Sequence, residues 1–390
     1  WAYAIEVDVE DPERPVVVDP LVLWNTYLGG PDNDASLWAI EQNAAGDIFI
    51  AGTIGPPSPG GGGGVIGTGV QNGAGGDVIV ARFGPDGSLI WWTLFGGNGA
   101  DGASALLLGA SDAVYVTGFT RSSVFEWSLP DGTPGEGSSL AAGDPGDAFV
   151  ARLDSTGRRL DWFERINWGG EDTINDLIWG PNGRLFIAGQ TRVKRLVSGA
   201  EVASEEGFIS RLDPSQRRKE WDLTILGPGG GVGDESVRTL ALRDDTSLYA
   251  TGYFSDDSID PDRVTNAFLS VISGINEASP TVDSNVPMGG KGSETGVAIT
   301  RPAGGTGNTV LVWGNTIGEV FPLAGQINGG ADIFVSRVED NGGKLTLKET
   351  KLLGGSKFDT IDVVKTDSSG RIYLGGHTTS PDLPAEGGFD

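Results

Sequence analysis

A double glycine followed by a carboxylate recurs along this 390-residue chain and constrains its fold more than any other feature. In residues 93–101 an extended run ends at Gly96 and Gly97, and Asp101 follows four residues later. A repeat of this kind must be recognised before any other assignment, because it decides the whole architecture. The six copies end at these carboxylates: Asp34, Asp101, Asp172, Asp234, Glu294 and Asp359.

Each repeat predicts four short strands, named a to d here in chain order. The first repeat places strand a near residues 36–40, strand b at 47–53 and strand c at 77–83, and strand d runs into the double glycine. The turns between strands c and d, such as Gly84-Pro85-Asp86-Gly87, have the composition of hairpin turns. Four short strands per long repeat predict an all-β propeller in which each repeat is one blade.

The two ends of the chain supply complementary halves of one blade. Residues 2–8 match strand c and residues 21–27 match strand d, whereas the last repeat contains only strands a and b. We therefore predict a single domain over residues 1–390, a six-bladed β-propeller of four-stranded blades. Its closing blade is shared by about residues 1–30 and 356–390, with N-terminal strands c and d joining C-terminal strands a and b. Such a ring leaves no open first or last blade.

The repeat resembles the bacterial SBBP-type β-propeller repeat over essentially the whole chain. The resemblance is carried by Tyr27-Leu28-Gly29-Gly30, by residues 146–154 with their Gly-Asp-Ala-Phe-Val-Ala-Arg-Leu-Asp sequence, and by residues 368–384. It implies a propeller fold in an exported or surface-attached bacterial protein. It implies no catalytic residues, because the repeat has no catalytic motif to carry over.

Charge and composition exclude several classes of function. The formal net charge is −26, which disfavours binding to nucleic acid or to anionic lipid and favours solubility, divalent cations or a basic partner. The absence of cysteine excludes disulfides, thiolate zinc sites and cysteine nucleophiles. No run approaches the length of a membrane helix. The chain begins at Trp1 without a signal peptide, so we read it as a mature or excised product.

The connections between strands b and c are long and varied, and they point to the surface that makes contacts. The second one, residues 121–146, carries apolar side chains that form either a contact patch or a segment folded back onto its blade. These candidate interaction residues are Phe125, Trp127, Leu129 and Leu140. The third connection, residues 192–206, starts basic and ends acidic and predicts a short helix or a hairpin.

The six recurring carboxylates have two interpretations. They could form a ring of cation ligands at the mouth of the propeller channel. Alternatively, each accepts backbone N–H bonds after its glycine turn, or pairs with a recurring strand-c arginine, and so holds the scaffold together. The repetition in every blade favours the scaffold. The arginines concerned are Arg82, Arg152, Arg211 and Arg337.

The fourth b–c connection is the best single candidate for a calcium site, although it lacks an EF-hand pattern and a solvated acidic loop is the alternative. Its carboxylates are Asp256, Asp257, Asp260 and Asp262. The only histidine, His377, occupies a slot that differs in every repeat, which indicates a structural role. No other cofactor is expected.

These observations predict a non-catalytic, exported scaffold that binds protein partners through its b–c loops, as a subunit or surface component of a larger bacterial assembly. The expected location is extracellular, cell-surface or periplasmic. The alternative is a carbohydrate-binding or hydrolase/lyase propeller with a carboxylate-lined site at the channel mouth, with a glycan as partner.

Overall fold

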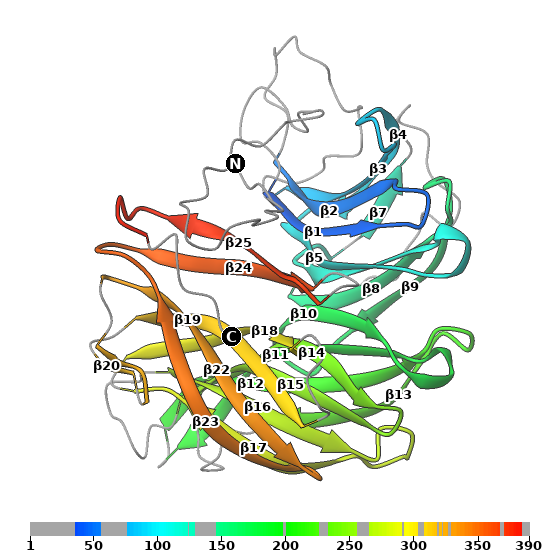
Figure 1. The fold of residues 1–390 in the computed structure, drawn as a ribbon. Coiled ribbons are helices and arrows are strands. Elements are labelled where there is room, and N and C mark those ends of the chain that lie inside the picture. The colour runs from blue at the N-terminus through cyan, green and yellow to red at the C-terminus, as the bar shows by residue number, and fades with distance from the viewer. Residues whose placement is uncertain are drawn as a thin grey trace.

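A computed structural model provides the structure of the chain (Figure 1). It describes residues 36–55, 76–123, 125–128, 146–197, 200–225, 233–255, 265–290, 292–302, 308–317, 320–321, 323–326, 329–366 and 370–383.

Within these ranges the fold is all-β, built from antiparallel sheets that follow one another along the chain. The first sheet contains β1 (Ser36–Gln42), β2 (Ile48–Ile54), β3 (Asp77–Phe83), β4 (Leu89–Gly97) and β7 (Phe125–Ser128). The second contains β5 (Asp101–Leu108), β6 (Val114–Thr120), β8 (Asp147–Leu153) and β9 (Leu160–Ile166). The third contains β10 (Glu171–Trp179), β11 (Leu185–Val197), β12 (Ala200–Asp213) and β13 (Arg218–Ile225).

The second half of the chain continues this order. The fourth sheet contains β14 (Glu235–Asp244), β15 (Ser247–Ser255), β16 (Thr265–Ser273) and β17 (Thr281–Met288). The fifth contains β18 (Ser293–Thr300), β19 (Thr309–Ile317), β22 (Asp332–Asn341) and β23 (Lys344–Leu353). The sixth pairs β24 (Asp359–Thr366) with β25 (Ile372–Thr378), and β20 (Val320–Phe321) and β21 (Gly325–Gln326) form a small separate hairpin. Two 3-10 turns, Ala110–Asp112 and Pro181–Gly183, join first and second strands.

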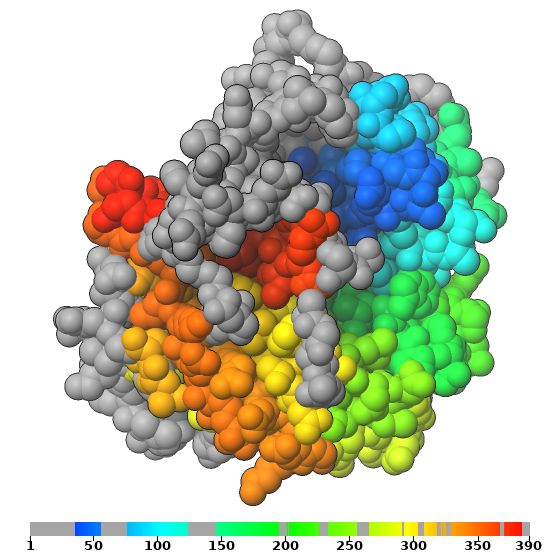
Figure 2. All heavy atoms as spheres, in the orientation of Figure 1, coloured from blue at the N-terminus to red at the C-terminus, as the bar shows by residue number. Residues whose placement is uncertain are grey.

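The predicted order of strands a to d is confirmed in the four-stranded sheets, where each strand of a repeat pairs with the next of its four strands, and β7 and β20–β21 are additions within the b–c connections. The first strands of successive sheets also contact one another, from β1 to β5, then β10, β14, β18 and β24. The sheets therefore have a propeller-like arrangement around their first strands. The colours of Figure 2 follow one another around the molecule in chain order, from blue through green to orange.

The core lies between successive sheets rather than inside any one of them. Phe49 of the first sheet and Phe149 of the second belong to one buried cluster, and Phe186 of the third packs in another with Phe268 of the fourth. Both faces of an inner sheet are thus buried, which explains the nearly continuous apolar runs of strands b and c. A further buried cluster, including Ile79 and Trp92, lies on the other face of the first sheet.

Each first strand carries one extra residue at the same place, a β-bulge that sequence reasoning missed. The register between the first two strands of each sheet skips one residue of the first strand. The bulged residues are Trp38, Ser104, Asn175, Arg238, Val297 and Asp362. Two of them reach the next sheet: Ser104 donates to the carbonyl of Ile174, and Asn175 donates to that of Val237 at 2.9 Å.

Candidate functional site

The recurring carboxylates are buried parts of the scaffold where the structure describes their turns. Asp101 is fully buried and accepts hydrogen bonds from the Gly97 backbone N–H at 2.8 Å and from the Ser122 hydroxyl at 2.7 Å. Its own backbone N–H donates to the Gly76 carbonyl of the preceding sheet at 3.0 Å. The residue therefore fastens its glycine turn and joins two sheets at once.

Three sister carboxylates make the same bond to the second glycine or its equivalent. Asp172 accepts from the Trp168 N–H at 3.0 Å, Glu294 from the Gly290 N–H at 3.0 Å, and Asp359 from the Gly355 N–H at 2.7 Å. All three are buried. The scaffold interpretation holds for these four residues, whereas Asp34 lies outside the described residues.

The fourth sheet departs from this pattern. In its register Val237 pairs with Gly252, which places Glu235, and not Asp234, at the position of Asp101. Asp234 instead accepts a hydrogen bond from the backbone N–H of Glu205 in the third sheet at 3.0 Å. The spacing after the glycines is irregular in this repeat, so sequence alignment alone shifts the carboxylate by one residue.

Among the described residues, the recurring arginines pair with other acids and not with these carboxylates, contrary to our alternative expectation. Arg82 pairs with Asp47 at 2.5 Å, Arg211 with Glu220 at 2.6 Å and Arg337 with Glu349 at 3.5 Å. Arg152 pairs with Asp161. The partners lie away from the glycine turn, because Arg82 and Arg152 are near the last residue of strand c, whereas the glycine turn lies beside its first residue.

The first glycine of the pair leaves room for the side chain of a second acidic residue. A Cβ on Gly96 would overlap the carboxylate of Asp77, and one on Gly354 would overlap that of Asp332. Asp77 and Asp332 are buried at the start of strand c. Burial, and then the charge of Asp101, raise the pKa of Asp77 to about 7. Burial likewise raises the pKa of Asp172 to about 6.

The predicted calcium loop lies outside the described residues, because Asp256, Asp257, Asp260 and Asp262 all fall between residues 255 and 265. Within the described ranges no group of three or more histidine, aspartate or glutamate residues is placed to hold a metal ion. His377 lies on β25, exposed, with its Nδ1 2.8 Å from a carboxylate oxygen of the bulge residue Asp362.

The predicted interaction residues are only partly described. Phe125 and Trp127 belong to β7, whose backbone adds a fifth strand to the edge of β4, with Phe95 opposite Trp127. The connection joins β6 and β8 of the second sheet, so this part of it crosses to the first sheet and covers an edge there that would otherwise be open, instead of folding back onto its own blade. Leu129 and Leu140 lie outside the described residues.

The third b–c connection is a hairpin, one of its two predicted forms. The ladder of β11 and β12 continues for six residue pairs beyond Thr191 and Glu206, from Arg192–Glu205 to Val197–Ala200. Lys194 and Glu201 are both exposed on it, with their charged atoms 3.9 Å apart. The sequence signal was the change from basic to acidic residues along the connection.

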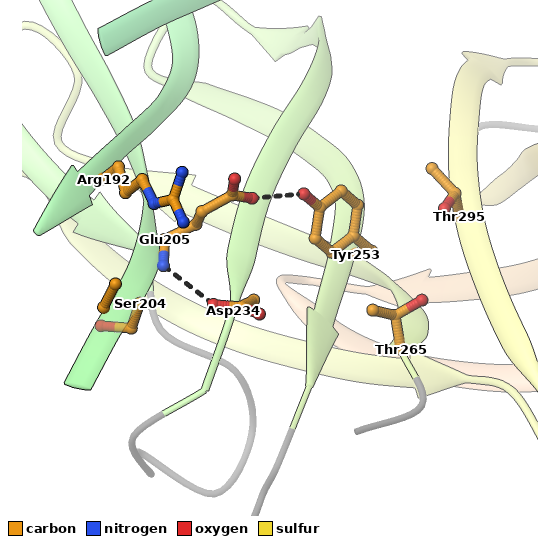
Figure 3. Close-up of a pocket in the computed structure, with 8 residues that line it drawn as sticks. Arg192, Ser204, Glu205, Asp234, Tyr253, Thr265 and Thr295 are labelled. Carbon is orange, nitrogen blue, oxygen red and sulfur yellow. Dashed lines mark hydrogen bonds between the residues drawn. The ribbon is translucent and has the colours of Figure 1, made fainter. Parts of the chain in front are cut away.

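A pocket of about 390 Å³ opens at the base of this hairpin, where the third, fourth and fifth sheets meet. Its lining residues are Arg192, Ala203, Ser204, Glu205, Asp234, Tyr253, Thr265 and Thr295. The Tyr253 hydroxyl donates to Glu205 at 2.7 Å, as drawn in Figure 3. Burial, and then the bond to Glu205, raise the pKa of Tyr253 well above its usual value, so the phenol keeps its proton.

Sequence reasoning did not predict this pocket, because its residues come from three repeats. The signal available in the sequence was the departure of these residues from the repeat. Tyr253 fills the slot that holds Phe119, Gln190 and Asn315 in other repeats, and the pocket lies beside the one carboxylate that is out of register.

Comparison with known proteins gives no family. No family model matches the chain, and no curated protein matches its sequence. A structure of a protein from Lactobacillus plantarum aligns at 12% identity over 80% of this chain and 84% of that one, with a TM-score of 0.43. The Dos1 propeller aligns at 9% identity over 88% of this chain and 92% of its own, with a TM-score of 0.41. Similarities this low carry no conclusion about function.

In the part of the chain that the structure describes, no helix is long and apolar enough to cross a membrane.

Proposed function

We propose that the chain is a closed ring of six SBBP-type blades that serves as a non-catalytic, exported binding scaffold. Its partners are proteins of a larger assembly on a bacterial surface, and its b–c connections make the contacts. The observation that carries the binding role is the β11–β12 hairpin, which continues its ladder well beyond the sheet from which it starts. A hairpin with a fixed register presents side chains with less ordering entropy to lose than a loop has.

Two contacts support closure of the ring. The sixth sheet contributes two described strands, and Lys365 of β24 lies 3.4 Å from Glu41 of β1, a contact expected where a last blade packs beside the first. The first sheet also buries an apolar cluster on the face turned away from the second sheet. Residues 1–30 are the segment of this chain with the strand pattern to complete the sixth blade and cover that face.

The burial and hydrogen bonding of the recurring carboxylates support a non-catalytic role. General acid–base chemistry needs carboxylates within hydrogen-bond reach of a substrate. Asp101, Asp172, Glu294 and Asp359 are instead buried and bonded to their own turns. Their repetition therefore serves the scaffold.

The test is a shortened hairpin. Residues 195–202 are replaced by Asn-Gly, which joins the cross-strand neighbours Lys194 and Ala203 through a two-residue turn. Cross-linking and mass spectrometry on native assemblies identify the partner, and its affinity is measured for both chains. The control is Arg218→Glu at the first residue of β13, an exposed change at the other end of the strands. Equal affinity for the shortened and intact chains would rule out the hairpin as the contact element.

A further inference from the structure

The pocket at the base of the hairpin is built where the repeat is broken. Arg192 and Glu205 come from the third sheet, Asp234, Tyr253 and Thr265 belong to the fourth, and Thr295 lies on β18 of the fifth. In Figure 3 Arg192, Glu205 and Asp234 lie on one side of the Tyr253 ring, and Thr265 and Thr295 lie on the other. Scaffold bonds recur from blade to blade, whereas this combination of side chains occurs once.

The polar groups of the pocket are held in place by the protein. Glu205 is fixed twice, since its carboxylate accepts from Tyr253 and its backbone N–H donates to Asp234. The backbone N–H of Asp234 in turn donates to the Ser255 hydroxyl at 2.7 Å. A ligand would therefore meet acceptors and donors that are already oriented, which lowers the entropic cost of binding.

One face of the Tyr253 ring is already occupied by an arginine of the protein. The Arg238 guanidinium lies 5.5 Å from the centre of the Tyr253 ring. It makes a cation–π contact with a face that a cationic ligand would otherwise use. Tyr253 thus serves the pocket chiefly through its hydroxyl and through the position it gives to Glu205.

We propose that this pocket binds a neutral polyhydroxylated ligand of monosaccharide size. The lining offers carboxylate acceptors, a guanidinium donor and the hydroxyls of Ser204, Thr265 and Thr295, which match a ligand whose groups both donate and accept. Among the described residues of the lining, Ala203 alone is aliphatic, so this lining does not suit an apolar ligand. Two carboxylates against one guanidinium also disfavour an anion such as phosphate. The volume is at the lower end of the range for ligand pockets.

This inference is independent of the protein-binding role, because the hairpin tip removed above does not line the pocket. The experiment is titration calorimetry of the full chain with glucose, galactose and mannose in turn, repeated with glucosamine as a cationic probe and inorganic phosphate as an anionic one. The variant Glu205→Gln removes the charge but keeps the shape. Its matched control is Glu201→Gln on the same strand, where the side chain is exposed and outside the pocket.

The expected result is millimolar or tighter binding of at least one neutral hexose, weakened about tenfold or more by Glu205→Gln and unchanged by Glu201→Gln. Tyr253→Phe is expected to weaken the same hexose, since Glu205 loses its anchor. Thermal melts of all variants verify that they are folded. The proposal would be overturned if no hexose binds or if only the cationic or anionic probe binds. It would also be overturned if Glu205→Gln leaves the hexose affinity unchanged.

Discussion

The backbone N–H of Asp101 donates to the carbonyl of Gly76, the residue before Asp77, at 3.0 Å, and the charge of Asp101 adds to burial in raising the pKa of Asp77 to about 7. Asp77 and Asp101 are both almost completely shielded from solvent. Asp77 therefore keeps its proton up to near neutral pH. Because the pKa of Asp77 is higher in the folded than in the unfolded protein, its contribution to stability falls as pH rises.

Asp77→Asn is expected to stabilise the protein at about pH 8 and not at about pH 4. An acid that binds its proton more tightly when folded contributes less stability as pH rises from its unfolded pKa of 3.8 to about 7. A tenfold difference in proton affinity corresponds to about 1.4 kcal/mol, so the gain at high pH is on the order of 1–3 kcal/mol. Urea unfolding at several pH values measures it. The exposed Asp245→Asn is the control, and parallel pH curves for wild type and Asp77→Asn would contradict the assignment.

Gly96→Ala is expected to destabilise the protein by about 1–3 kcal/mol, the cost of overpacking a tight site. The new Cβ would overlap the carboxylate of Asp77. The double variant with Asp77→Ala removes the group that it strikes, so the two changes together should cost less than their sum. Denaturant unfolding of the four proteins gives the coupling, and simple additivity would show that the carboxylate is not what the glycine accommodates.

Asp340→Ala is expected to cost about 1.5–3 kcal/mol, because it removes the buried carboxylate that joins Arg243 and Tyr249 between the fourth and fifth sheets and leaves Arg243 with the exposed Asp244 as its ion-pair partner. The Asp340 carboxylate accepts from Arg243 Nε and from the Tyr249 hydroxyl, both at 2.5 Å. Burial alone would raise the pKa of Asp340, but the bonds from Arg243 and Tyr249 outweigh it and hold the pKa below the usual value.

This network also predicts the direction of acid unfolding. A depressed pKa contributes stability above the unfolded value of 3.8, and that stability is lost as pH falls further. Wild-type protein should therefore lose stability below about pH 4 more steeply than Asp340→Ala does. Equilibrium unfolding between about pH 5 and pH 2 compares them, and identical acid slopes would exclude Asp340 as a source of this loss.

Carbodiimide treatment is expected to join Glu41 to Lys365 within one molecule, because the Lys365 Nζ of β24 lies 3.4 Å from a carboxylate oxygen of Glu41 in β1. Peptide mass spectrometry of the monomer detects the bond, and Lys365→Arg should abolish it. The Lys348–Glu339 pair, 3.0 Å apart within the fifth sheet, is the internal standard. Cross-linking of the standard without the 41–365 product would argue against ring closure.

The strand order and the turns could be predicted from the sequence because they are local properties. The strand predicted at residues 77–83 is β3, and the c–d turn at Gly87 has the positive φ of 80° that favours glycine there. The role assigned to the double glycine was incomplete. Gly96 faces Asp77, which comes nineteen residues earlier, and no local pattern reveals that approach.

The pocket and the register of the fourth sheet could not be predicted for a related reason. Asp234 was aligned by its distance from the glycines, but strand pairing places Glu235 at the repeated position. The sequence shows Tyr253 only as one variable residue among several. Its role in the pocket depends on its hydrogen bond to Glu205 in the neighbouring sheet. Contacts between repeats arise from packing geometry, which a comparison of repeats with one another does not contain.

The bulge in each first strand has a consequence for how such a chain can diversify. A bulged residue has no partner in the ladder, so its identity is not tied to the alternation of the strand. The six positions accordingly hold an indole, a hydroxyl, an amide, a guanidinium, an isopropyl group and a carboxylate at Trp38, Ser104, Asn175, Arg238, Val297 and Asp362. One substitution per sheet, made without rewriting any strand, is a short mutational route from uniform repeats to chemically distinct sheets.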